Sequence, residues 1–321
     1  MIVNSLAYKQ NTKPRKVDVA DISEVLKEPG TFVWLGIADP DNEELRTVQE
    51  EFSLHDLAIE DALTAHQRPK LESYGNSMFI ALRTVHLVKG EIHYGEAHLF
   101  VGTNFIVTVR HGQVQSFASV RERAEVSTDL LAKGPAYVLY AIIDFIVDQY
   151  SEVVDALEHR FEALEGEIFG DRFDRAAIER LYDIKSDLLK LRSAAMPVES
   201  ICGELIRLHE EVVSKDLRAY FRDVQDHVSR VVSIVDVVRD MLTTAIQVNL
   251  ALVSVTQNEI VKRLAGWGAV LAVPTVVFSL YGMNFKVMPE LQWPWAYPVV
   301  LALTVCGCAG LFWRFRKEGW L

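Results

Sequence analysis

The 321-residue sequence has few cysteines and no excess of positive charge. Its three cysteines are Cys202, Cys306 and Cys308. The last two are two positions apart, so on a helix they point to different faces, and we predict small core residues rather than a metal-binding pair. The net charge is −11, and most of the negative charge falls on residues 1–263. This balance argues against a nucleic-acid partner, which requires Lys and Arg to neutralise phosphates.

The motifs of several enzyme classes are also missing. There is no G-x-x-x-x-G-K-[ST] loop to cradle nucleotide phosphates. His209-Glu210 begins like the zinc motif H-E-x-x-H, but Val213 stands where the second histidine belongs. The nine histidines are scattered without paired spacing. We therefore predict that the protein is not an enzyme.

The first 16 residues contain no long apolar core of the kind found in a signal peptide. We expect the large N-terminal domain to remain on the cytoplasmic side of a membrane.

Two long runs lack charge altogether: Leu264–Gly282 and Trp295–Trp313, each of 19 residues. A helix needs roughly 20 apolar residues to cross about 30 Å of hydrocarbon. The connection between the runs is too short for a domain, so they predict a helical hairpin through the bilayer. Lys and Arg flank the hairpin on the side of both chain ends, which predicts that both termini are cytoplasmic. These flanking residues are Lys262, Arg263, Arg314, Arg316 and Lys317.

The N-terminal part reads as a mixed domain of strands and short helices, an α+β fold. Apolar, β-branched and aromatic content predicts four strands. They cover residues 31–37, 77–88, 92–101 and 104–110. A short helix containing Leu57, Ile59 and Leu63 lies between the first two.

Helical spacing replaces this pattern after Gly134-Pro135. Ala136–Phe169 has apolar residues at helical intervals, and Asp171 is placed to cap a second helix, which contains Pro197. The apolar positions of the first helix are Leu139, Ile142, Ile143, Ile146, Val153 and Leu157.

A third helix is predicted to begin near Asp216, and the next Gly or Pro in the sequence is Gly266. Continued to Gly282 it has 67 residues, about 100 Å at 1.5 Å each, which is too long for an ordinary globular helix. We predict a stalk that runs into the bilayer. It has no clean heptad, and part of its apolar surface has no partner in the chain, which predicts self-association in a closed ring.

Four stretches give the sequence its resemblance to a known family. They are YGMNF at Tyr281–Phe285, MPEL at Met288–Leu291, LAIEDAL to HQRPKLE across Leu57–Glu72, and YFRDVQDHV at Tyr220–Val228. Together with two C-terminal spans and a basic tail, they resemble the CorA family of magnesium channels over the whole chain. The resemblance implies a homopentamer in the inner cell membrane, with Mg²⁺ as both transported and regulatory ion.

The implied architecture is an α+β cytoplasmic domain, a long stalk helix and a two-helix transmembrane hairpin. The expected segments are 1–133 (α/β domain), 134–213 (antiparallel helices), 214–263 (stalk), 264–283 (first span), 284–294 (external loop), 295–313 (second span) and 314–321 (basic tail).

The resemblance places an ion selectivity filter at Gly282, Met283 and Asn284. Mg²⁺ releases its waters reluctantly, so an entrance can recognise the hydrated ion. A ring of Asn284 amide oxygens would accept hydrogen bonds from coordinated water without binding too tightly for exit. Without the motif, interfacial capping of a helix end would be the preferred interpretation of this asparagine.

Further family pore positions match Thr275, Ala272, Leu264, Val261, Asn258 and Gln247. Leu264 and Val261 are expected to form an apolar constriction that gates by excluding water. Val261 and Ala272 are smaller than the Met common in relatives, and Gln247 replaces an Asp seen in some. A weaker inner ion site is therefore expected.

Acidic residues complete the predicted site. Glu290 in the loop would concentrate cations near the entrance, or would be an ordinary solvated acid. Asp223 matches a family regulatory residue, with Asp226 as a nearby candidate, and both have the alternative of a solvated or Arg-paired helix acid. The resemblance also implies an acidic partner for Asp223 on the neighbouring subunit, but no residue of this sequence can be matched to that partner.

The resulting expectation is uptake of divalent cations into the cytoplasm, chiefly Mg²⁺ with Co²⁺ and Ni²⁺, driven by membrane potential and closed by internal Mg²⁺. One alternative is a Zn²⁺ transporter of the same architecture, although Met283 favours Mg²⁺. Another is a membrane-anchored structural or signalling protein. The expected partners are further copies of the chain, the lipid bilayer and divalent cations.

Overall fold

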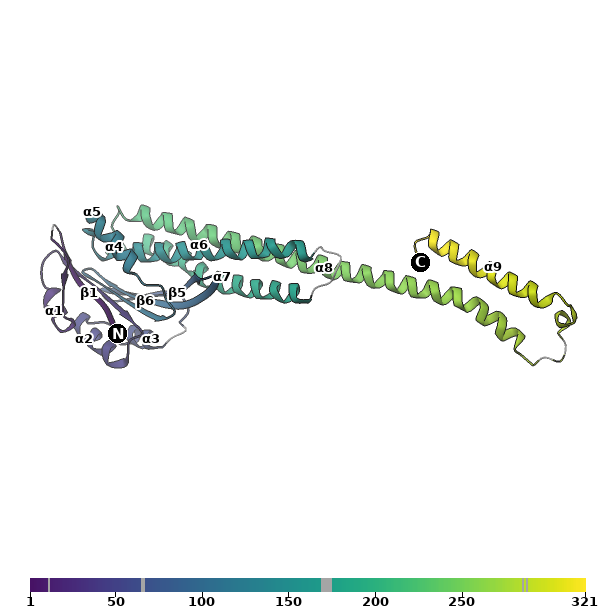
Figure 1. Ribbon diagram of the computed structural model, residues 1–321. Helices are drawn as coiled ribbons and strands as arrows, with labels where there is room; N and C mark the ends of the chain where they lie inside the picture. Colours follow the sequence, from purple (N-terminus) through teal and green to yellow (C-terminus); the bar gives the residue numbers. More distant parts are fainter. Residues whose placement is uncertain (11, 65–66, 169–174, 285, 287) are drawn as a thin grey trace. The chain divides into compact units, whose positions relative to one another are not determined.

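The computed structural model describes residues 1–321 except 11, 65–66, 169–174, 285 and 287 (Figure 1). The chain divides into two compact units: Met1–Gly170 with Asp174–Thr243, and Thr244–Leu321. An α/β sheet domain, a long helix and a C-terminal pair of apolar helices are all present, which confirms the predicted fold class.

The first unit is built on one seven-stranded sheet. Its strands are β1 (Ile2–Lys9), β2 (Arg15–Lys16), β3 (Thr31–Ala38), β4 (Lys70–Tyr74), β5 (Ser77–Val88), β6 (Glu91–Gly102) and β7 (Phe105–Gly112). The spatial order is β2-β1-β3-β7-β6-β5-β4, with β3 and β7 parallel and the other neighbours antiparallel.

The four predicted strands correspond to β3, β5, β6 and β7. β5 and β6 are joined through Lys89 and Gly90, whose φ values are +52° and +85°. Two successive positive φ angles are the requirement of a two-residue hairpin turn of type I′. β1, β2 and β4 were not predicted.

One face of the sheet packs against short helices. These are η1 (Val19–Asp21), α1 (Ile22–Val25), α2 (Asn42–Phe52) and α3 (Asp56–Leu63). Side chains of β3, β5, β6 and β7 form one buried cluster with Leu45, Phe52 and Ile59 of these helices. Asp41 fixes the start of α2 through a capping box with Glu44.

The other face is covered mainly by α6 (Pro135–Ile168), preceded by α4 (Ala118–Val126) and α5 (Thr128–Leu131). Tyr150 of α6 is fully buried, and its hydroxyl donates to the carbonyl of Arg83 in β5. The six apolar positions predicted for this helix, from Leu139 to Leu157, are all buried. The helical spacing therefore identified the covered face of α6.

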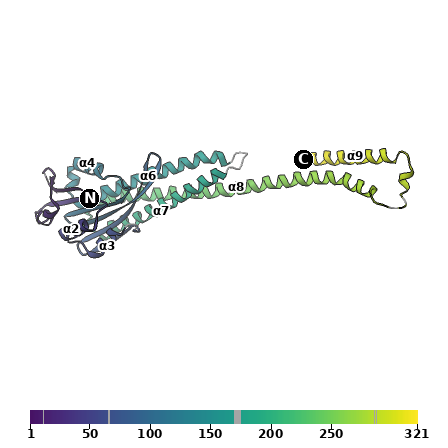
Figure 2. The ribbon, with the colours of Figure 1, turned by 60° about the horizontal axis from the view of Figure 1, so that its bottom comes forward.

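Two further helices pack with α6 (Figures 1 and 2). α7 (Arg175–Leu208) continues through Pro197, and its predicted cap, Asp171, lies outside the described residues. The first part of α8 (Arg218–Tyr281) contacts both: Tyr140 and Tyr220 rings are 5.2 Å apart, and Arg192 Nε lies 2.9 Å from Asp236 Oδ1. The predicted helix pair thus covers part of the stalk.

The second unit holds the rest of α8, the short η2 (Pro289–Gln292) and α9 (Ala296–Lys317). By length and composition, α8 and α9 can each cross a membrane. Only 11% and 6% of their apolar windows are buried, whereas the core helix of a soluble protein is mostly covered. Within this unit Cys308 Sγ lies 3.6 Å from the Val270 carbonyl oxygen, and the Trp267 and Phe312 rings are 5.8 Å apart.

Candidate ion path and cation-binding group

The predicted filter lies where α8 ends. The Gly282 amide donates to the Phe278 carbonyl at 2.9 Å, and the Met283 amide donates to Leu280 at 3.3 Å. Asn284 follows outside any helix, and its side chain is exposed, with no hydrogen bond to any described residue. The amide is thus available to water, ions or other copies of the chain.

A glycine suits position 282 for a steric reason. A Cβ there would lie 3.3 Å from the Phe278 carbonyl oxygen and 3.6 Å from that of Ser279. The shorter of these distances is tighter than most Cβ contacts, so a side chain here would require the last turn of α8 to shift by a few tenths of an ångström. Gly282 therefore allows the helix to close beside Asn284.

The six predicted pore-lining residues all lie on α8, and all are exposed in the single chain. Leu264 is 73% exposed and Val261 62%. The Thr275 hydroxyl donates to the Leu271 carbonyl of its own helix at 2.8 Å. In the described residues, no second element of the chain covers this face.

Other large apolar side chains of α8 are exposed as well. They include Val248, Leu252, Val255 and Ile260. Glu290, in η2, is also exposed. A row of uncovered apolar residues on a helix marks a surface for another protein or for lipid.

A separate group in the first unit combines acidic and histidine side chains. Asp144 and Asp148 of α6 and His227 of α8 place one ligand atom each within 4.8 Å of one another. Asp223 stands one turn before His227, with its Oδ2 3.9 Å from His227 Nε2. The predicted regulatory residue Asp223 therefore borders this group.

Burial raises the pKa of the Asp144 carboxyl, and the neighbouring Asp148 carboxylate raises it further. Asp223 acts in the same direction, whereas the cationic Arg123 and His227 lower this pKa. The net rise means that the ionised form of Asp144 is disfavoured in this partly buried position beside other carboxylates.

The donor set fits a divalent cation. Mg²⁺ prefers oxygen ligands from carboxylates and water. Asp144, Asp148 and Asp223 offer carboxylate oxygens. Imidazole nitrogen suits Co²⁺ and Ni²⁺ better, so His227 extends the group to those ions. Asp226 is exposed on α8 and is not part of the group within the described residues.

Asp144 and Asp148 were not identified from the sequence. The available signal was their spacing: Asp144 and Asp148 are two acids four residues apart, and Asp223 and His227 repeat that spacing on α8. Only the packing of α6 against α8 brings the two pairs together.

The fold and these sites define a class of protein: a membrane protein with an α+β domain, a long helix and two apolar C-terminal helices. A family model described as "CorA-like Mg2+ transporter protein" matches residues 29–317.

Two relatives are each 31% identical. One is the "Cobalt/magnesium transport protein CorA" of Thermotoga maritima, over 96% of this chain and 89% of the relative. The other is the "Putative metal ion transporter YfjQ" of Bacillus subtilis, over 90% of each. The chain belongs to the CorA-like Mg²⁺ transporter family, as its motifs indicated.

Solved structures agree on the fold. The CorA magnesium transporter from Methanocaldococcus jannaschii has a TM-score of 0.83 at 21% identity over 100% of both chains. The full-length CmaX protein has a TM-score of 0.78 at 18% identity, over 98% of this chain and 97% of that one.

Proposed function

We propose that this chain is one subunit of a homopentameric channel that admits Mg²⁺, together with Co²⁺ and Ni²⁺, into the cytoplasm. Family membership and the names of the relatives support the class of cargo. The observation that carries the proposal is the position of Asn284, exposed at the end of an apolar helix and directly after Gly282-Met283. Both termini lie on the cytoplasmic side in this arrangement.

The exposed face of α8 supports assembly from several copies. Two membrane helices per chain cannot enclose a water-filled path, and the six pore positions have no cover within the described part of one chain. A closed ring buries the same surface on each copy and leaves the axis open. The number five rests on the family resemblance.

In the ring, the Asn284 amides form a collar around the axis and accept hydrogen bonds from waters of the hydrated ion. Neutral oxygens hold the ion less firmly than carboxylates, so it can move on. Gly282 and Met283 set the position of the collar, and Glu290 raises the local cation concentration outside it.

Further in, Leu264 and Val261 form the constriction. A ring of apolar side chains can exclude water from the constriction, and ions then cannot pass even though no segment of the protein blocks the path. Asn258 and Gln247 offer amide oxygens below it, and Thr275 and Ala272 line the path above. Entry follows the membrane potential, which contributes roughly 2.3 kcal/mol per charge per 100 mV, or about 4.6 kcal/mol for a divalent ion.

We also propose that internal Mg²⁺ closes the channel through the group of Asp144, Asp148, Asp223 and His227. Burial and the neighbouring carboxylates raise the pKa of Asp144, and a bound cation would offset both effects and so hold α6 and α8 together. Asp226 is a further carboxylate on the same helix that can attract the ion.

The test is cation flux into liposomes that contain the purified protein and a Mg²⁺-sensitive dye. With an inside-negative potential we expect saturable Mg²⁺ entry that stops when the potential is collapsed. Entry of Zn²⁺ with no entry of Mg²⁺ would favour the zinc transporter. No entry of either ion above that of empty liposomes would leave the structural or signalling alternative.

A further inference from the structure

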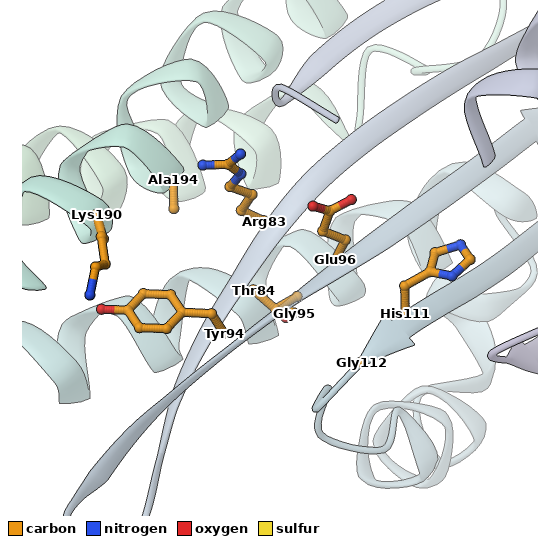
Figure 3. Close-up of a pocket in the computed structure, with 9 residues that line it drawn as sticks. All are labelled: Arg83, Thr84, Tyr94, Gly95, Glu96, His111, Gly112, Lys190 and Ala194. Carbon is orange, nitrogen blue, oxygen red and sulfur yellow. The ribbon is translucent and has the colours of Figure 1, made fainter. Parts of the chain in front are cut away.

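The first unit contains a pocket of about 350 Å³ that the ion path does not use, and several charged side chains line it among apolar surface (Figure 3). Arg83 of β5 is paired with Glu96 of β6, which is in turn paired with His111 of β7. Directly paired residues share one face of a sheet, so these three side chains form a row across it. Tyr94 of β6 and Lys190 of α7 lie at one end of the row.

Arg83 supplies an unused positive charge. Its guanidinium makes no hydrogen bond or ion pair with the described residues, although Glu96 lies opposite it in the sheet. Lys190 adds a second positive charge: its Nζ is 3.1 Å from Asp187 Oδ1 and 5.2 Å from the centre of the Tyr94 ring. Tyr94 donates its hydroxyl to the same Asp187 oxygen at 3.1 Å. Lys190 is therefore held beside Tyr94 at one end of the row.

Acceptors lie toward the other end. Glu96 is 7% exposed and accepts a hydrogen bond from the Gln67 amide at 3.2 Å, and His98 Nε2 lies 3.4 Å from the same Oε2 atom. A carboxylate has about four acceptor positions, so it can take another donor. Burial lowers the pKa of His111, which therefore stays neutral near pH 7, and its buried Nε2 has no hydrogen-bond partner among the described residues.

The pocket thus has cationic groups at one end and acceptors at the other. An inorganic anion would meet Arg83 but would also meet the Glu96 carboxylate, which repels it. A molecule with an anionic group and separate hydroxyl or amino donors would satisfy both ends. The planar guanidinium binds phosphate oxygens in pairs. The Lys190 ammonium has three N–H donors, so it can donate to a further phosphate oxygen while it remains paired with Asp187.

We propose that this pocket binds a small organic phosphate that also carries hydroxyl or amino groups. The phosphate lies between Arg83 and Lys190, and the donors of the organic part reach Glu96 and His111. Because the pocket lies on the sheet domain, binding there is independent of the proposed ion path.

The test is calorimetric titration of the full-length protein in detergent with ribose 5-phosphate, inorganic phosphate and ribose. We expect ribose 5-phosphate to bind with a Kd below about 1 mM, and the two fragments to bind at least about tenfold more weakly. Arg83→Met should raise the Kd for ribose 5-phosphate about tenfold or more, because a charge-assisted pair of hydrogen bonds is lost.

Two variants make the test independent of folding defects. Lys190 is exposed, so Lys190→Met should leave the fold intact and raise the Kd about threefold. Arg46 is exposed on α2 outside the pocket, so Arg46→Met should leave the Kd unchanged. The proposal is overturned by no saturable binding at about 10 mM ribose 5-phosphate, by equal Kd values in the parent and both pocket variants, or by equal affinity for inorganic phosphate.

Discussion

Replacing Asn284 by alanine should lower Mg²⁺ entry into liposomes by about tenfold or more, because each copy loses an amide that receives the hydrated ion. The side chain is exposed and has no hydrogen bond to the described residues, so the substitution removes no contact that holds the fold. Protein yield and thermal stability should therefore match the parent. Because the substitution affects the passage of Mg²⁺ and not folding, it should appear as a lower maximal rate of dye response.

The matched control is Gln292→Ala. Gln292 is also an exposed amide, eight positions further along the same connection, at the end of η2. Its removal should leave Mg²⁺ entry within about twofold of the parent. Equal losses in both variants would mean that the connection as a whole matters, and that Asn284 forms no collar.

Replacing both Asp144 and Asp148 by asparagine should weaken closure by internal Mg²⁺. The double variant keeps the size of both side chains but removes the two negative charges that the cation would neutralise. We expect the internal Mg²⁺ concentration for half-closure to rise about tenfold or more. Flux at low internal Mg²⁺ should remain near that of the parent.

A second readout separates ion binding from transport. Mg²⁺ should raise the thermal unfolding temperature of the parent, and this rise should disappear in the double variant. Asp155→Asn, an exposed position on the same helix, should keep both responses. If the double variant still closes at the parental Mg²⁺ concentration, or if Asp223→Ala does so, the regulatory role of this group is wrong.

The stretches best predicted from the sequence are those in which side chains at regular intervals share the same surroundings along the whole helix or strand. The apolar positions of α6 all face one covered side, and β5 has the predicted bounds, Ser77–Val88. β4 was missed because the run KLESY carries two charges and no β-branched residue. Its position comes from pairing with β5, a long-range contact that local composition does not encode.

The residues of the candidate site also divide into those that the sequence identified and those that it did not. Asn284 was identified because a short motif and two charge-free runs lie together in the sequence. Asp144 and Asp148 were not, because their meaning depends on His227, 79 or more positions away in the chain. The proposed collar would lie between copies, so no single chain would contain its geometry.

The most direct measurement is chemical block at position 284. Cys202, Cys306 and Cys308 are first replaced by serine or alanine, and Asn284→Cys is then introduced. A positively charged methanethiosulfonate reagent added outside should stop Mg²⁺ entry into liposomes, because charges on several copies meet at one collar. Full labelling of the new cysteine with Mg²⁺ entry unchanged would contradict the proposed ion path.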